Sequence, residues 1–140
     1  MAKKTAGAFM SKKIKVLIII ASIVVVLAVA VGVFFAVAKK SLDNLNAMTI
    51  EDIDLSTVPD GTYNGSYSAF PVSAEVEVTV LNHTITEIKI IKHDEGKGEP
   101  AEAITDRVIS AQSIYVDAVS GATLSSKVII MAIKDALTLD

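Results

Sequence analysis

The 140-residue chain contains no cysteine, no tryptophan and only two histidines, His83 and His93. Without cysteine it can form no disulfide, carry no lipid on an N-terminal cysteine, and hold no iron–sulfur cluster or covalent c-type haem. Two histidines without cysteine argue against a dedicated zinc site or a bis-histidine haem site. The sequence shows no acid–base pair, Ser–His–Asp set or cluster of metal ligands. We therefore expect neither a catalytic residue nor a metal.

Charge is distributed unevenly along the chain. Residues 1–40 carry seven lysines and no acid, whereas residues 41–140 carry all 16 acids against six bases, a net charge of −10. Such an acidic part is poorly suited to bind nucleic acid, because phosphate contacts need clustered cations. It should also be repelled by anionic lipid headgroups. We expect no nucleic-acid partner.

Residues 16–38 are 23 consecutive residues without a charge. A helix of that length is about 35 Å long, enough to cross a hydrocarbon core of about 30 Å. A buried helix of a soluble protein does not fit, because the remaining residues are too few to surround a helix that is apolar on every face. A cleavable signal peptide is the alternative, since Ala36-Val37-Ala38 resembles a cleavage site. The stretch is, however, longer than the apolar region of about 7–15 residues that signal peptides carry.

Five lysines precede the apolar stretch, and only Lys39 and Lys40 follow it closely. The positive-inside bias predicts a single-pass protein of the cell membrane with a cytoplasmic N-terminus. We accordingly expect a basic cytoplasmic segment (1–15), a transmembrane signal anchor (16–38), a flexible linker (39–59) and an extracytoplasmic domain (60–140). A flexible stretch of that length would span about 25 Å root-mean-square.

The external part reads as an α+β domain of about three antiparallel strands and two helices. Alternating apolar and polar residues predict strands over 62–68, 74–80 and 85–92, with a tight turn at Asn82-His83. A loop over 93–99 then leads to helices predicted over 100–112 and 124–137.

Small and hydroxylated residues concentrate before the last helix, in the run DAVSGATLSS over 117–126. Gly121 permits a tight turn and the close approach of a ligand. Thr123 lies at the start of the helix, where unsatisfied N–H groups and the helix dipole favour a phosphate. Simple helix capping by serine or threonine is the alternative. The spacing of Asp117 and Ser126 around this turn makes the segment more specific.

Together with DGTYNGSY, the strand pair and the loop HDEGKGE, this run resembles the FMN-binding domain family, and the resemblance covers residues 60–140. The family's flavinylation pattern is Asp, two residues, Ser or Thr, Gly, Ala, Thr. The resemblance implies that a flavin transferase moves FMN from FAD onto the hydroxyl of Thr123 as a phosphodiester. The residues that match the pattern or flank it are Asp117, Ser120, Gly121, Ala122, Thr123 and Ser126.

The resemblance also implies an electron carrier that works outside the cytoplasm. A membrane quinone-linked dehydrogenase would supply the electrons, and an external acceptor or reductase would receive them. The small external domain favours a stand-alone carrier over a subunit of a pumping complex. Two alternatives stay open: a flavin-bearing accessory subunit of a larger membrane complex, and a non-redox anchored binding module whose serine-rich turn is a cap.

Other residues are weaker candidates for the site. His93, in the predicted loop, is a possible flavin contact, with a solvated loop histidine as the alternative. Ile130 lies between Lys127 and Lys134 on the predicted polar face of the last helix. It is expected to be a scattered surface residue, with a docking or flavin-edge surface as the alternative. The aromatic residues that could stack on an isoalloxazine ring, or serve in the core, are Tyr63, Tyr67, Phe70 and Tyr115.

Overall fold

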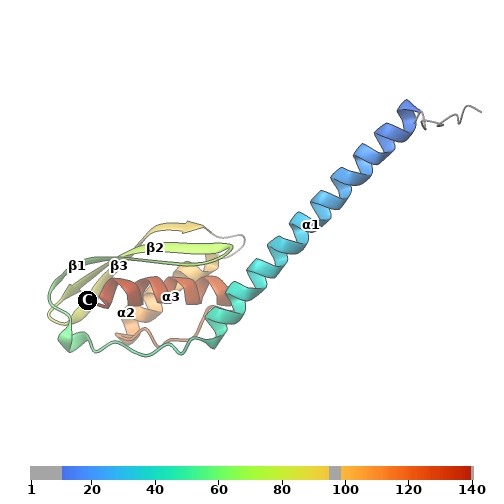
Figure 1. Ribbon diagram of the computed structural model, residues 1–140. Coiled ribbons are helices and arrows are strands. Elements are labelled where there is room, and N and C mark those ends of the chain that lie inside the picture. The colour runs from blue at the N-terminus through green and yellow to red at the C-terminus, as the bar shows by residue number, and fades with distance from the viewer. Residues whose placement is uncertain (1–10, 95–98, 140) are drawn as a thin grey trace, which may run out of the picture. The chain divides into compact units, whose positions relative to one another are not determined.

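The computed structural model describes residues 11–94 and 99–139 (Figure 1). The chain divides into two compact units, Met1–Val37 and Ala38–Asp140. The α+β class, with one apolar N-terminal helix, three antiparallel strands and two further helices, is confirmed. The elements are α1 (Lys12–Ala47), η1 (Leu55–Thr57), β1 (Gly61–Ala69), β2 (Val72–Leu81), β3 (Thr84–Asp94), η2 (Glu99–Ala103), α2 (Ile104–Ala111) and α3 (Thr123–Leu137), where η marks a 3-10 helix.

The described part of the first unit is the N-terminal portion of α1. Every side chain from Ser11 to Val37 is exposed, although most of this segment is apolar. A helix of a soluble protein buries an apolar stripe, whereas exposure on all sides suits lipid. The helix is long and apolar enough to cross a membrane. It begins before residue 16 and ends beyond residue 38, so the bounds of the span itself stay a prediction.

The strands of the second unit form a meander in the order β1-β2-β3. In β2 the inward side chains from Ala74 to Val80 are buried, and the alternate ones are more exposed. The β2–β3 turn falls on Asn82 and His83, whose φ angles of 51° and 57° are those of a tight hairpin turn. The predicted strands and their turn are confirmed.

Two β-bulges in β3 shift the alternation of its side chains. Thr86 and Ile91 have no partner in β2, whereas the residues on both sides of each are paired. An extra residue turns the following side chains to the opposite face of a sheet. As a result Ile85, Ile88 and His93 all point to the face that the helices cover.

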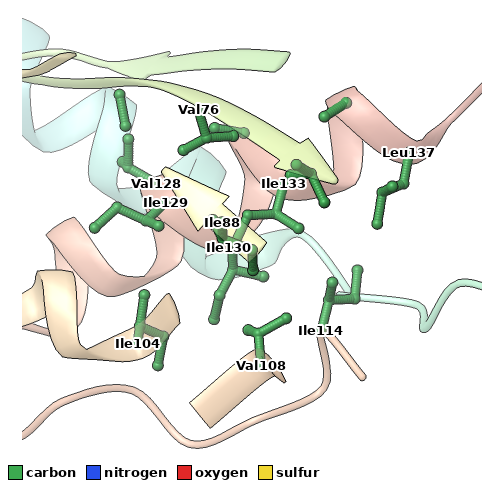
Figure 2. Close-up of a cluster of buried hydrophobic side chains, with 14 of the residues drawn as sticks. Val76, Ile88, Ile104, Val108, Ile114, Val128, Ile129, Ile130, Ile133 and Leu137 are labelled. Carbon is green, nitrogen blue, oxygen red and sulfur yellow. The ribbon is translucent and has the colours of Figure 1, made fainter. Parts of the chain in front are cut away.

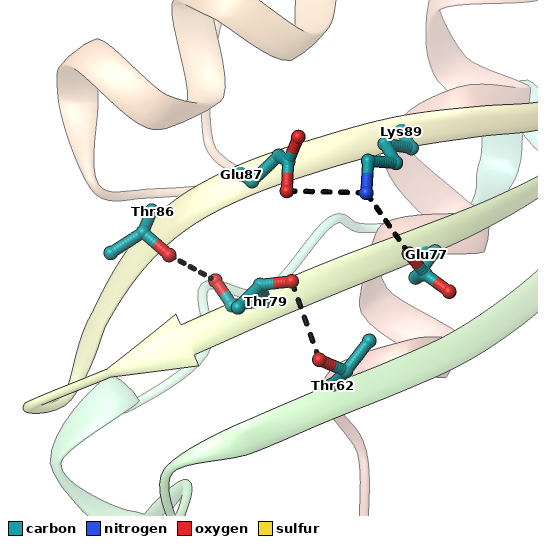
Figure 3. Close-up of polar contacts among 6 residues, drawn as sticks. All are labelled: Thr62, Glu77, Thr79, Thr86, Glu87 and Lys89. Atoms are coloured by element: carbon teal, nitrogen blue, oxygen red, sulfur yellow. Dashed lines mark hydrogen bonds and ion pairs between the residues drawn. The ribbon is translucent and has the colours of Figure 1, made fainter.

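The opposite face of the sheet is polar (Figure 3). The hydroxyls of Thr62 and Thr79 lie 3.4 Å apart across β1 and β2. Lys89 Nζ lies 3.6 Å from a carboxylate oxygen of Glu77 and 3.4 Å from one of Glu87. Such exposed ion pairs contribute little to stability, but they make this face of the sheet hydrophilic. The apolar core therefore lies on the helical side only.

On that side α3 packs directly over Gly65 of β1. A Cβ atom at Gly65 would overlap the backbone oxygen of Ala132 and the backbone nitrogen of Ala136. The neighbouring Ser66 N–H donates to Asp135 Oδ2 at 2.9 Å. The missing side chain at Gly65 is what lets helix and strand approach this closely.

The expectation that Ile130 is a surface residue is wrong. Ile130 is 1% exposed, because α2 and the chain after it cover a second side of α3 (Figure 2). Val108 of α2 and Ile114 belong to this contact. Since α3 packs both on the sheet and against α2, its buried stripe is wider than a single-faced helix would need.

The single helix predicted over 100–112 is two helices. The 3-10 helix η2 precedes α2, and α2 is followed by Gln112, which lies in the left-handed region with a φ of 51°. The Gln112 side-chain amide donates to the carbonyl of Ile85 and accepts from its N–H, both at 2.8 Å. The side chain thereby satisfies backbone groups at the outer edge of β3.

The structure also differs from the flexible linker expected over residues 39–59. In this segment α1 continues to its end, where Leu45 is 3% exposed and Asn46 Oδ1 accepts a hydrogen bond from Lys127 Nζ at 2.7 Å. Val58 is 2% exposed. These contacts are made by single side chains and not by a repeating apolar face. Sequence periodicity therefore does not show them. The segment is part of the folded unit.

Candidate functional site

The loop between α2 and α3, residues 112–122, carries most of the predicted motif. Of the five residues that match the flavinylation pattern, Ala122 is buried, and Asp117, Ser120, Gly121 and Thr123 are exposed. The helix α3 begins at Thr123. The predicted position of this threonine at a helix start is therefore confirmed, and four motif residues face outward together.

A tight turn immediately precedes Thr123. Gly121 has a φ of 78°, in the left-handed region that favours glycine. The N–H of Ala122 donates to the carbonyl of Val119 at 3.0 Å and closes the turn. No described atom lies within 4 Å of the place that a Cβ on Gly121 would take. Backbone conformation, rather than lack of space, therefore selects glycine here.

Ser126 holds this turn from the inside. Its side chain is 0% exposed. Its hydroxyl donates to the carbonyl of Ala122 at 2.8 Å and accepts from the N–H of Val119 at 3.0 Å. Both hydrogen bonds are made to the loop, so Ser126 fixes the loop's shape. A contact between Ser126 and a cofactor stays a prediction.

The hydroxyl of Thr123 is exposed and has no hydrogen-bond partner among the described residues. The residue before it, Ala122, supplies no side-chain cap to α3. Among the described residues, no side chain of the motif therefore caps α3. The first N–H groups of this 15-residue helix keep their capacity to bind an anion, and the helix dipole adds to it.

Arg107 of α2 contacts the start of the motif, a role that the sequence did not indicate. Its Nη1 lies 2.9 Å from the carbonyl oxygen of Asp117 and 3.3 Å from that of Ala118. Ser126 and Arg107 thus hold the two halves of the loop. The signal in the sequence is slight. Arg107 is the only arginine and lies ten residues before Asp117, but only the fold brings the two into contact.

Asp52 fastens the same loop nearer to α2 and was likewise missed. It accepts hydrogen bonds from Ser113 Oγ at 2.5 Å, from Ile114 N at 3.1 Å and from Ile53 N at 2.9 Å. Partial burial pushes the pKa of Asp52 upward, but the bonds from Ser113, Ile53 and Ile114 outweigh burial and hold the pKa below its ordinary value. The carboxylate is therefore charged at neutral pH.

His93 lies in β3 rather than in a loop. Its side chain is 2% exposed, so the alternative of a solvated loop histidine is wrong. Its Nδ1 is 3.3 Å from Glu102 Oε1, and its Nε2 is buried with no hydrogen-bond partner among the described residues. The bulge at Ile91 accounts for the inward direction, since it moves His93 to the covered face. Contact with a flavin stays a prediction.

The aromatic candidates differ in how they are used. Tyr63 donates to the carbonyl of Pro59 at 2.8 Å, and Tyr67 donates to the sulfur of Met48 at 3.2 Å. Both rings also pack against the core. Tyr115 is 76% exposed, two residues before the motif. The first two are engaged in the fold, and stacking of Tyr115 on a cofactor stays a prediction.

The exposed residues of the motif do not line either of two hollows on the surface. A depression of about 300 Å³ lies near Gly65 and contains no motif residue. A second hollow, of about 390 Å³, is lined by residues between Ile53 and Val58 and at the C-terminal end of α3. Neither hollow contains Thr123. A covalent bond to Thr123 would therefore retain a bound group without either hollow.

Residues 71–138 match the sequence model of a family described as FMN-binding domain. The matched segment includes the whole motif and His93. A comparison with curated proteins finds none that matches the chain.

Proposed function

We propose that this protein, whose residues 71–138 belong to the FMN-binding domain family, is a membrane-anchored electron carrier that bears FMN covalently on Thr123. The family match supports a flavin-binding protein. The observation that carries the finer assignment is the exposed hydroxyl of Thr123, which has no partner among the described residues. It lies at the uncapped start of α3, inside the matched segment. When bound, FMN supplies reversible transfer of one or two electrons.

The residues present suit a phosphodiester at this position. The first N–H groups of α3 have no side-chain cap, and the dipole of the helix favours negative charge there. A helix start can therefore hold the phosphate without needing a lysine, although residues 41–140 carry a net charge of −10. The Nε2 of His93 is buried and has no partner in the part of the chain that the structure describes, so it is a further polar atom that a bound group could satisfy.

Attachment would be a transfer from FAD. The Thr123 oxygen forms a bond to the phosphorus on the FMN side of FAD, the pyrophosphate bond of FAD breaks, and AMP leaves. A base of the flavin transferase takes the hydroxyl proton. No electron moves between donor and acceptor in this step, so it requires no oxidant or reductant. The chain contributes an accessible hydroxyl on a loop of fixed shape.

A covalent bond has a physical reason here. The exposed residues of the motif line neither hollow, and outside the cytoplasm a dissociable FMN would be lost by dilution. The five lysines before the apolar stretch favour a cytoplasmic N-terminus, and Thr123 would then lie outside. The proposed electron donor is a membrane quinone-linked dehydrogenase, and the acceptor is an external acceptor or reductase.

The test is to produce the full chain together with a flavin transferase and to look for flavin fluorescence on a denaturing gel. The wild type should fluoresce, and Thr123→Val should not. Thr49→Val, which alters an exposed threonine outside the matched segment, is the control and should fluoresce like the wild type. A colourless wild type would overturn the proposal and favour a non-redox binding module. Fluorescence that survives in Thr123→Val would overturn the attachment site.

A further inference from the structure

Arg107 makes a contact that the family motif does not include. It projects from α2, and its Nη1 donates to two consecutive carbonyl oxygens, those of Asp117 and Ala118. No carboxylate among the described residues forms an ion pair with Arg107. Residues 41–140 carry a net charge of −10, and the only arginine of the chain thus binds the backbone of the motif.

The contact is not needed to hold α2 in place. Ile104 and Val108 of α2 are both 0% exposed and anchor the helix in the core. The Arg107 residue is exposed. Loss of its guanidinium should therefore free the first half of the loop while the fold persists. The second half would still be held by Ser126.

The two contacts leave the motif's side chains free. While Arg107 and Ser126 bind backbone groups from residue 117 to residue 122, Asp117, Ser120 and Thr123 are exposed. An enzyme that modifies Thr123 must bind this strip in one conformation. If the strip already has that conformation, little ordering entropy opposes binding.

We propose that Arg107 is a positioning residue for flavin transfer to Thr123: it holds the start of the loop in the conformation that the transferase binds. The inference rests on the proposed function. If the loop has the binding-competent conformation for only a fraction of the time, the apparent affinity of the transferase for the chain falls by that fraction. The rate of the step after binding is unchanged. The expected signature is therefore a change in KM rather than in kcat.

The experiment uses the purified full chain in detergent micelles, a flavin transferase and FAD, with the concentration of the chain varied. Covalent FMN is followed by in-gel fluorescence. Arg107→Gln should raise KM about tenfold, the factor that corresponds to about 1.4 kcal/mol, and should leave kcat within about twofold. Arg107→Lys, which keeps a charged donor, should fall between the wild type and Arg107→Gln.

Lys89→Gln is the matched control, because it removes a cation from the polar face of the sheet, among contacts that do not involve the motif. It should leave both constants unchanged. Urea unfolding of each variant, measured before flavin transfer, shows whether the variant is folded. If Arg107→Gln is not folded, the KM of Arg107→Lys is used for the test instead.

Several results would overturn the inference. They are an unchanged KM in a folded Arg107→Gln, a loss of kcat with KM unchanged, and equal effects of Arg107→Gln and Lys89→Gln. In these cases the wild type still accepts FMN, so the proposed function stands. A wild type that accepts no FMN overturns the proposed function, and this inference with it.

Discussion

The hydroxyl of Ser126 accepts a hydrogen bond from the N–H of Val119, seven residues earlier, at 3.0 Å. The same hydroxyl donates to the carbonyl of Ala122, so one buried side chain bridges both ends of the turn before Thr123. The adjacent Ser125 is also buried, at 5% exposed, but its hydroxyl has no partner among the described residues. The two neighbouring serines therefore form a natural pair for comparison.

Ser126→Ala should destabilise the domain by about 2 kcal/mol, because it leaves the part-buried N–H of Val119 without its hydrogen bond. Ser125→Ala should change stability by less than about 0.5 kcal/mol, since it removes a hydroxyl that has no bond to lose. Urea unfolding followed by tyrosine fluorescence measures both, because all three tyrosines lie in the second unit. Equal losses in the two variants would contradict the role given to Ser126.

Gly65→Ala should destabilise the domain by about 3 kcal/mol, the upper part of the range for overpacking, because the new methyl group meets the backbone of α3. Backbone atoms cannot rotate away as a flexible side chain can. Ser68→Ala, at an exposed position of the same strand, is the control and should be close to neutral. A Gly65→Ala protein as stable as the wild type would show that α3 does not pack this closely.

Asp52→Asn should weaken the domain at neutral pH, and the weakening should disappear in acid. The pKa of Asp52 in the folded chain is below the unfolded value of about 3.9, so its stabilisation is present above that value and is lost as pH falls through the folded pKa. Because Asp52 is largely exposed, we expect about 1 kcal/mol or less. Urea titrations at pH 7 and at pH 3 measure the difference.

Asp60→Asn, at another exposed position, is the control for charge removal. It should have little effect at either pH. A difference between wild type and Asp52→Asn that grows toward acid would show that the sign assigned to Asp52 is wrong.

The absence of cysteine gives a clean test of topology. A single cysteine placed at Ser68 should react with a membrane-impermeant maleimide in intact cells, because the positive-inside bias puts the domain outside. One placed at Thr5 should react only after the cells are opened. The reverse pattern of labelling would refute the orientation, and labelling of both in intact cells would exclude a single span with a cytoplasmic N-terminus.

Local pattern was enough to predict the strands, the Asn82-His83 turn and the helix start at Thr123. Each depends on residues close together in sequence: alternation within a strand, two turn residues, or small residues before an apolar stripe. The motif itself is contiguous as well, so its place immediately before the last helix could be predicted.

What the sequence did not show depends on contacts between distant residues. Ile130 is buried because α2 returns to cover α3, and His93 is buried because a bulge at Ile91 changes the phase of β3. Bulges and second packing layers follow from the tertiary fold, not from local periodicity. The same is true of Arg107, which lies next to Asp117 only because of how the chain turns after α2.

The central claim, that Thr123 carries FMN, is tested most directly by mass spectrometry of the full chain produced with a flavin transferase. The account predicts an intact mass higher by one FMN less one water, and fragment spectra that place the whole addition on Thr123. It predicts no addition in Thr123→Val and a full addition in Thr49→Val. An unmodified wild-type mass, or an addition placed on Ser120 or any other residue, would contradict it.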